Sequence, residues 1–380
     1  MDLLSTFRLI YLIGAANALF FSFLVFSKKK KTLADKILGW WLIILFGQLI
    51  IPTLYLTNIN LYYHFAGIEI IFYVFHPLFL YWYVKATIGQ INKWKGIIWQ
   101  LIVVVLYEVF SLSFFFYPAK ERLLFIEGKE LFPLYYFPVA ILITVYFACF
   151  IYATYKLLKD YKDNVLQVYS YRENVDLLWL RRLVGLFAGI CILIFPLGLI
   201  AYYGFHSMAF TDYYFFITLV VFIFFLGFWG YQQGEIFNIN SNAFQDEVEN
   251  TEITENAPNG NSQIEKNFKQ EAMLLKELMK KEKPYLEPSL TIHDLAGKLK
   301  MPPHQLSKVI NKELHCNFFE FVNKYRIEDF KQRAFSTDYK NMTILGIALD
   351  CGFNSKSAFN RIFKDVTGLT PGDFIKNHKR

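Results

Sequence analysis

The chain has 380 residues, of which 55% are hydrophobic, 19% aromatic and 19% charged. The apolar and aromatic shares lie above the usual values for a soluble globular chain, and the length exceeds one ordinary hydrophobic core. The sequence therefore predicts either two or three domains or a membrane half joined to a soluble half.

The formal net charge of +7 is distributed unevenly along the chain. Between Leu9 and Trp229 the apolar runs are long and the charges gather in short clusters, whereas residues 266–380 hold 21 Lys or Arg and 13 Asp or Glu. The basic surplus thus belongs to the C-terminal segment, where it indicates binding to nucleic acid or to an anionic membrane surface.

Seven apolar stretches are long enough to form transmembrane helices, because a bilayer core needs about 20 mostly apolar residues per helix. The predicted spans are residues 8–27, 37–57, 63–84, 96–117, 134–155, 183–204 and 211–232. The predicted fold class is therefore all-α, with a seven-helix transmembrane bundle over residues 1–232.

The Lys and Arg residues between the predicted spans indicate their orientation. The first, third and fifth connections hold 14 of them, whereas the opposite side holds four. By the positive-inside rule, the N-terminus is predicted to lie outside the membrane and the residues after Trp229 in the cytoplasm. The predicted location is the inner membrane of a bacterial cell. A signal peptide cleaved after Ala18 is the alternative for the first span, but the apolar run continues to Phe26 and ends on four lysines.

Two carboxyl groups, Glu69 and Glu108, fall inside the predicted spans. Glu69, Tyr73 and His76 are spaced so that they share one face of a helix, and charged groups inside a membrane are costly enough to suggest a function. These four residues form the candidate sensor site, and a buried hydrogen-bonded group that fixes helix packing is the alternative. Since no enzyme motif, CxxC pair or zinc spacing accompanies them, we expect no catalysis, no metal site and no cofactor.

Residues 233–265 contain no Lys or Arg but seven acidic residues. A segment of low hydrophobicity and like charge cannot bury enough apolar surface to become ordered. The sequence therefore predicts a flexible acidic linker between residues 1–232 and a C-terminal domain over residues 266–380.

The C-terminal segment contains an internal repeat. Residues 291–314 (TIHDLAGKLKMPPHQLSKVINKEL) repeat the pattern of residues 343–369 (TILGIALDCGFNSKSAFNRIFKDVTGL). The repeat predicts two helix-turn-helix units, with Gly352 in the second turn and Asn354 or Ser355 as the N-cap of the helix that follows. A helix over residues 318–335 between them is about 27 Å long. Such a spacer would let the two units read successive major grooves, which are about 34 Å apart.

The segment from about residue 264 to the C-terminus resembles the DNA-binding domain of AraC/XylS-type transcription regulators. The motif GFNSKSAFNRIFKDVTGLTP is similar to the second helix-turn-helix of that family. The resemblance implies a seven-helix all-α domain that binds double-stranded promoter DNA. Together with the N-cap candidates, the implied DNA-binding residues are His304, Gln305, Ser307, Lys308, Asn354, Ser355, Lys356, Ser357, Asn360 and Arg361. The chain departs from the family pattern at Pro302-Pro303, where a serine cap is common, and at Phe330, where a small residue is usual.

The combined features predict a membrane-anchored, sequence-specific transcription regulator that acts as a one-component sensor. Its expected partners are promoter DNA, the lipid membrane and an unknown signal ligand, with pairing into a homodimer left open. One alternative is a transporter or membrane enzyme whose tail regulates its own promoter. Another is a tail that binds a peptide or protein and is basic for that reason.

Overall fold

The computed structural model describes residues 3–65, 67–90, 95–126, 136–171, 177–202, 208–233, 261–339 and 341–378. Within these ranges the secondary structure is helical and contains no strand, which confirms the all-α prediction. Contacts divide the chain into two compact units. The first unit is Met1–Leu158 with Leu178–Gln245, and the second is Lys159–Leu177 with Asp246–Arg380.

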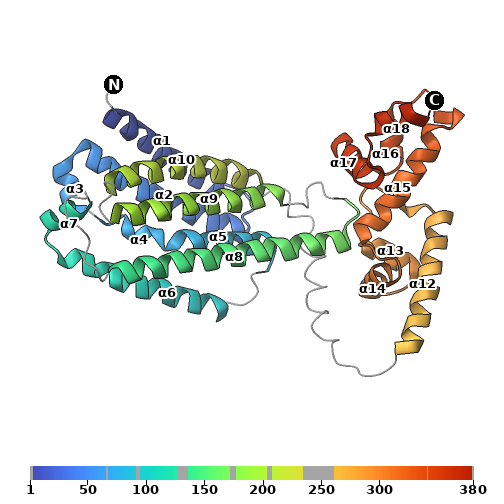
Figure 1. Cartoon of the computed structure of the whole chain (residues 1–380), viewed down its shortest axis with the longest axis horizontal. Helices are drawn as coiled ribbons and strands as arrows, with labels where there is room; N and C mark the ends of the chain where they lie inside the picture. The colour runs from blue at the N-terminus through green and yellow to red at the C-terminus, as the bar shows by residue number, and fades with distance from the viewer. Residues whose placement is uncertain are drawn as a thin grey trace. The chain divides into compact units, whose positions relative to one another are not determined.

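The first unit consists of long apolar helices with shorter helices between them (Figure 1). Its helices are α1 (Leu3–Phe26), α2 (Leu33–Thr57), α3 (Ile59–Phe65), α4 (Ile70–Tyr73), α5 (Phe75–Thr87), α6 (Lys95–Leu112), η1 (Ser113–Phe116), α7 (Ala119–Ile126), α8 (Tyr136–Val168), α9 (Leu178–Tyr202) and α10 (Met208–Gln233). Residues of α8 beyond Leu158 belong to the second unit.

Five described helices are long and apolar enough to cross a membrane: Thr6–Phe26, Leu33–Leu54, Phe137–Val168, Leu178–Gly198 and Tyr214–Gln232. A sixth candidate is the pair Gln100–Phe116 and Ala119–Phe125, which is bent by 111°. The predicted span at 63–84 differs most from expectation, since it is divided among α3, α4 and α5 with a turn at residues 67–69. The seven-span bundle stays a prediction.

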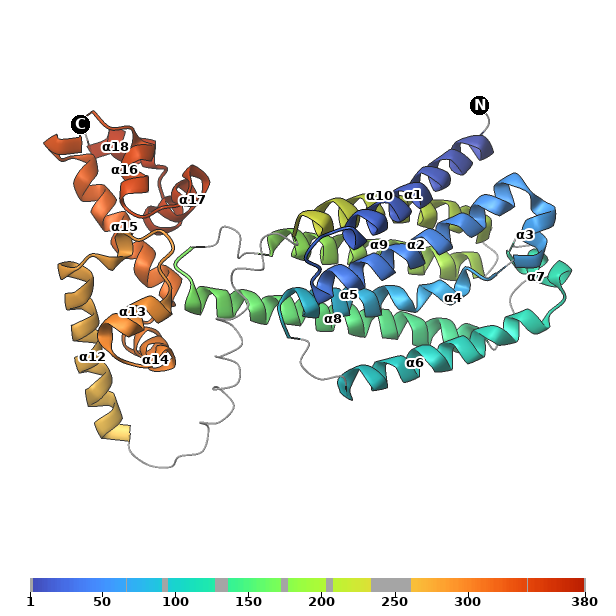
Figure 2. The same ribbon diagram turned by 180° about the vertical axis from the view of Figure 1, so that it is seen from behind.

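The core of the first unit lies between α1, α2, α5 and α10, and both ribbon views show α1, α2 and α10 side by side (Figures 1 and 2). Trp41 and Leu38 of α2 are fully buried there. Gly14 of α1 faces Val220 of α10 so closely that a Cβ atom would lie 2.4 Å from the valine Cγ2. The small residue therefore permits the close helix approach that is typical of membrane helix pairs.

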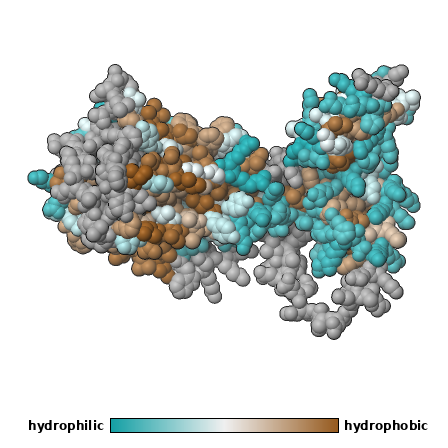
Figure 3. All heavy atoms as spheres, in the orientation of Figure 1, coloured by the Kyte–Doolittle hydropathy of each residue, from teal (hydrophilic) through white to brown (hydrophobic). Residues whose placement is uncertain are grey.

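The outer surface of the first unit is apolar over much of its length. Phe23 of α1 is 67% exposed, Leu106 of α6 is 64% exposed and Ile192 of α9 is 75% exposed. Brown apolar residues cover much of this unit in the space-filling view (Figure 3). Contiguous apolar surface of this kind marks contact with a membrane or with a partner protein.

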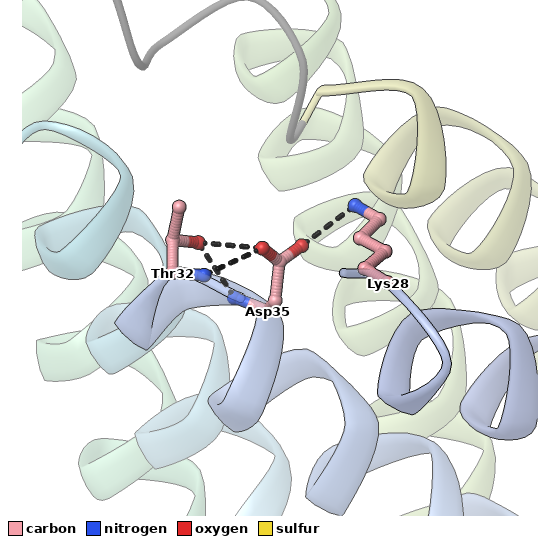
Figure 4. A network of polar contacts seen from close by, with 3 residues as sticks. All are labelled: Lys28, Thr32 and Asp35. Atoms are coloured by element: carbon pink, nitrogen blue, oxygen red, sulfur yellow. Dashed lines mark hydrogen bonds and ion pairs between the residues drawn. The ribbon is translucent and has the colours of Figure 1, made fainter. Parts of the chain in front are cut away.

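The connection between α1 and α2 is held by a compact polar network (Figure 4). The Thr32 hydroxyl and backbone N–H both donate to Asp35 Oδ2, each at 2.8 Å, and the Asp35 N–H donates back to the Thr32 Oγ1 at 3.1 Å. Lys28 Nζ donates to the other Asp35 oxygen at 2.7 Å. This capping box starts α2 and satisfies its first donors. The next three lysines, Lys29, Lys30 and Lys31, stay exposed.

In the described part of the second unit, seven α-helices and two short 3-10 turns accompany the end of α8. They are α12 (Asn261–Lys281), η3 (Pro284–Leu286), α13 (Ile292–Leu299), α14 (Pro303–Glu313), α15 (Phe318–Ala334), η4 (Thr337–Tyr339), α16 (Ile344–Asp350), α17 (Lys356–Thr367) and α18 (Pro371–His378). Of the predicted linker, residues 234–260 lie outside the described residues, and α12 begins within its last part.

The predicted spacer helix is present as α15, and it is buried on most of its sides. Its N-cap Asn317 accepts the Glu320 N–H at 2.9 Å and forms a capping box with it. Phe330 is fully buried, and its ring centroid lies 4.6 Å from that of Phe359 and 5.5 Å from that of Phe363. The large side chain at position 330 therefore joins the spacer to α17 through aromatic packing.

Candidate nucleic-acid interface

The turn between α16 and α17 has a geometry that its sequence dictates. Gly352 has φ +91°, and a Cβ atom there would lie 2.4 Å from the backbone oxygen of Tyr285. Only glycine adopts this conformation without strain. Ser355 is the N-cap of α17, where its Oγ accepts the Ala358 N–H at 3.1 Å. Of the two predicted caps, the structure therefore selects Ser355, and Asn354 lies exposed beside it.

Helix α17 has one buried face and one exposed face. Its buried residues are Ala358, Phe359, Ile362 and Phe363. Its exposed residues include Lys356, Ser357, Asn360, Arg361 and Lys364. These five side chains supply two amide or hydroxyl groups and three positive charges, which are the groups that contact base edges and phosphates.

The first helix pair, α13 and α14, has the same order of parts. Thr291 caps α13 and exchanges hydrogen bonds with Asp294 in a capping box. Lys300 ends α13 in the left-handed conformation, with φ +51°. Pro302 is the N-cap of α14 and Pro303 is its first residue, a position that suits proline. Two successive prolines therefore start this helix without a side-chain cap.

Helix α14 also buries one face and turns the predicted DNA-binding residues away from it. Leu306, Val309 and Ile310 are buried, whereas His304 and Lys308 are exposed and Gln305 and Ser307 are half-buried. Residues of other helices contact the two half-buried side chains.

Those contacts come from α12 and from the end of α8. Gln305 Nε2 donates to Glu271 Oε1 of α12. Ser307 Oγ donates to Gln167 Oε1 at 3.3 Å, and Asn311 Nδ2 donates to the same oxygen at 3.0 Å. Sequence reasoning missed Glu271 and Gln167, because they lie 34 and 140 residues from their partners and no local pattern signals the contact.

The turn residue Cys351 is fully buried beneath α17. Burial and the neighbouring Asp329 carboxylate raise the pKa of its thiol to about 12. Since the thiolate is the reactive form of cysteine, this side chain behaves as a small apolar residue of the helix-turn-helix core.

The candidate sensor residues lie on different elements of the first unit. Glu69 precedes α4 and accepts a hydrogen bond from the Tyr62 hydroxyl at 3.0 Å. The Tyr73 ring packs edge-on against Phe215, with centroids 5.3 Å apart.

His76 lies on α5, and its Nδ1 accepts the Trp41 Nε1–H at 3.2 Å while its Nε2 contacts Gln48. Glu108 lies on α6, where its Oε1 is buried and has no hydrogen-bond partner among the described residues. The break between α3, α4 and α5 is the reason that the predicted spacing does not give one continuous helix face. Trp41, Gln48 and Tyr62 were not predicted. The described residues contain no group of three or more His, Cys, Asp or Glu able to hold a metal ion.

An all-helical unit with short helix pairs and a basic, exposed second helix defines a helix-turn-helix domain. Comparison with known proteins agrees, since residues 295–377 match the family model described as "Helix-turn-helix domain", of the AraC type. The "Probable transcription factor PqrA" of Proteus vulgaris is 34% identical over 88 residues, which are 23% of this chain and 70% of that protein.

The "Uncharacterized HTH-type transcriptional regulator YtdP" of Bacillus subtilis (strain 168) is 33% identical over 88 residues, and the chain covers 11% of its length. No solved structure matches the chain significantly. The chain belongs to the AraC-type family of helix-turn-helix transcriptional regulators through its C-terminal region.

Proposed function

We propose that this chain is a membrane-anchored, sequence-specific transcription regulator whose apolar helices respond to a signal in the membrane or outside the cytoplasm. The observation that carries the proposal is the exposed face of α17, with Lys356, Asn360 and Arg361, in the same chain as five candidate spans. Soluble DNA-binding proteins have no use for helices of that apolar length.

The side chains of α17 have distinct roles in this proposal. Arg361 and Lys356 pair with guanine edges and Asn360 with adenine, in the major groove. Lys364 holds a phosphate, and the start of the helix attracts a second one through its dipole and free N–H groups. Ser355 already accepts the Ala358 N–H, so its part is to fix the start of α17 rather than to read a base.

The first helix pair acts as a second reading unit, through His304, Gln305, Ser307 and Lys308. The 17 residues of α15 lie along the sequence between the first helix pair, α13 and α14, and the second helix pair, α16 and α17. At about 1.5 Å per residue the spacer is roughly 26 Å long, which suits two units in successive major grooves.

The proposed topology is an N-terminus outside a bacterial inner membrane and a C-terminal domain in the cytoplasm. The exposed lysines 29–31 after α1 support it, because basic connections stay on the cytoplasmic side. A second support is the hydrogen bond between Arg326 of α15 and Ser170, just after α8. The connection after α8 and the DNA-binding helices must then lie on the same side of the membrane.

The proposed signal site lies around Glu69 and His76, which are buried polar groups in the apolar unit. A signal ligand changes DNA occupancy only if it binds two states of this unit with different affinity. Pairing of protomers into a homodimer is one way to transmit that difference, since paired domains read two sites at once.

The test is DNA binding by the full-length protein in lipid nanodiscs, measured as a function of salt. A regulator that neutralises several phosphates loses affinity steeply, with a linear fall of log affinity against log salt. Retention that is insensitive to salt would instead favour a peptide-binding tail. Substrate uptake that disappears in Glu69→Gln while DNA binding persists would favour a transporter with an autoregulatory tail.

A further inference from the structure

The residues that follow α8 are anchored inside the helix-turn-helix unit by Ser170. Its side chain is fully buried, and its Oγ donates to the Leu290 backbone oxygen at 2.7 Å. Its N–H donates to the same oxygen at 3.2 Å. Every polar atom of Ser170 is satisfied, since its backbone oxygen accepts from Asn323 Nδ2 at 2.9 Å. A serine held in this way is a specific anchor rather than an incidental contact.

Arg326 of α15 completes this anchor. Its guanidinium is 1% exposed and donates to the Ser170 backbone oxygen at 3.1 Å and to the Ser170 Oγ at 3.2 Å. Two further donors reach the backbone oxygens of Tyr285 and Glu287, each at 2.7 Å, and a fifth reaches Asn323 Oδ1 at 3.4 Å. A buried guanidinium needs all of its donors satisfied, and this one uses Ser170 for two of them.

The neighbours of Ser170 extend the contact along the chain. Tyr169 forms an isolated antiparallel bridge with Thr291, the N-cap residue of α13. Leu166 packs against the apolar cluster that contains Phe330 and Phe359. Residues 166–171, which we name the docking segment, therefore touch both helix pairs of the unit.

Gln167 places this docking segment on α14. Its Oε1 accepts hydrogen bonds from Ser307 and Asn311, which lie one turn apart on the helix. Ser307 is one of the residues predicted to contact DNA. A side chain that holds Ser307 occupies the space that a base edge or phosphate would need.

We infer that the docking segment is the partner of a dedicated surface on the helix-turn-helix unit, made by Arg326, Asn323 and α14, and that it keeps the first helix pair off DNA. The inference rests on the proposed function and concerns its regulation. In the docked state α17 is open to DNA, whereas Ser307 and Asn311 of α14 are held by Gln167. Release of the segment opens α14, so that the protein reads two major grooves instead of one.

The position of the docking segment explains how a membrane event reaches it. The candidate span Phe137–Val168 has 32 residues, and its last three residues are the first three of the docking segment. A helix of that length measures about 48 Å, against a hydrocarbon core of about 30 Å, so its last turns project beyond the core. A shift of this helix along or across the membrane therefore pulls on Gln167 and Ser170.

The test measures the DNA affinity and the length of the DNA footprint of the full-length protein in nanodiscs. Four variants are compared with the wild type, three with a substitution in α8 and one with a substitution just after it. Gln167→Ala removes the acceptor for Ser307 and Asn311, and we expect about three- to tenfold tighter binding. The protected DNA should lengthen by about one helical turn, roughly 10 base pairs. Ser170→Ala removes the anchoring hydroxyl without adding volume, and it should change both readouts in the same direction.

Two matched variants separate this effect from a general disturbance of α8. Gln167→Glu keeps the acceptor oxygen and adds a negative charge, so its DNA affinity should equal or fall below that of the wild type. Asn164→Ala changes an exposed residue one turn earlier and should leave affinity and footprint unchanged.

The outcomes distinguish the inference from the proposed function. If Gln167→Ala and Ser170→Ala bind DNA like the wild type while Arg361→Ala loses binding, the docking segment has no inhibitory role and the regulator stands. If no variant retains DNA above background, both are wrong. Tighter binding with an unchanged footprint would also contradict the opening of a second groove.

Discussion

The two helix pairs of the second unit share a sequence pattern but differ in what contacts their second helices. On α17 the polar residues Lys356, Asn360 and Arg361 are exposed. On α14 the corresponding face is engaged, because Gln305 donates to Glu271 and Ser307 donates to Gln167. A repeat in sequence therefore predicts the helices and their buried stripes, whereas access to the exposed face depends on segments far away in the chain.

The two pairs also end their first helices differently. Both turns use a left-handed residue, which is Gly352 in the second pair and Lys300 in the first. A lysine in this conformation carries a steric cost of about 1 kcal/mol that glycine avoids. The second turn in addition packs against the Tyr285 backbone, so glycine is required there for space as well as for conformation.

The largest expected effect is that of Gly352→Ala. The added Cβ atom would meet the Tyr285 oxygen at 2.4 Å and force a left-handed alanine, so the unit should lose roughly 2–4 kcal/mol of stability. Hydrogen exchange of α17 amides in the full-length protein measures this loss. The matched variant Lys300→Gly should instead stabilise α13 by about 0.5–1 kcal/mol. Equal hydrogen-exchange protection in Gly352→Ala and Lys300→Gly would show that the two turns do not differ in their requirement for glycine.

Loss of the Arg361 side chain is expected to have the next largest effect. Arg361→Ala should weaken specific DNA binding by about 1–3 kcal/mol, roughly five- to 150-fold, and relax the preference at one base pair. Lys308→Ala on the first pair should cost less while that pair is docked. Lys276→Ala, which removes an exposed charge from α12, serves as the control. A larger loss of DNA affinity for Lys308→Ala than for Arg361→Ala would mean that α14, and not α17, is the helix that contacts DNA.

A smaller effect, of opposite sign, is expected at α12. Glu271→Ala frees Gln305 and removes a negative charge beside the DNA-binding face, so affinity should rise about two- to fivefold. Glu277→Ala removes an equal charge from an exposed position of the same helix and should change affinity less. Binding measured by fluorescence anisotropy at fixed salt compares the two variants. Identical gains would mean that only net charge matters.

A last effect, confined to alkaline pH, is expected in the pH dependence of stability. The folded-state pKa of Cys351 is raised from 9.0 to about 12, so the unfolded state loses this proton first as pH rises. The stabilising contribution is therefore complete below pH 9 and is lost progressively towards pH 12. Denaturation of the full-length protein across this range should show a shallower slope for Cys351→Ala than for the wild type. An unchanged slope would show that the thiol does not titrate there.

Local sequence signals predicted much of the second unit. The spacer helix, the turn at Gly352, the cap at Ser355 and the buried stripe of α17 all depend on residues within a few positions of one another, and the structure contains them. Burial of the polar Arg326 and Asn323 was not predictable in this way. Their partner Ser170 lies 156 and 153 residues away, outside any local pattern.

The first unit was predicted less completely, for a related physical reason. Apolar length predicted α1, α2, α8, α9 and α10, because a continuous apolar run is a local signal. The apolar run over residues 63–84 contains no comparable local signal for the ends of helices inside it, and the structure divides it among α3, α4 and α5. His76 then accepts a hydrogen bond from Trp41 of α2 and Glu69 accepts one from Tyr62 of α3, so the two groups have different partners and do not lie on one continuous helix.

The central claim is that the chain reads DNA sequence through α17. The most direct measurement mixes the full-length protein in nanodiscs with a pool of genomic fragments at physiological salt and sequences what is retained, beside Arg361→Ala. The account predicts discrete enriched sites that disappear in the variant. Uniform retention, equal for the wild type and Arg361→Ala, would contradict it.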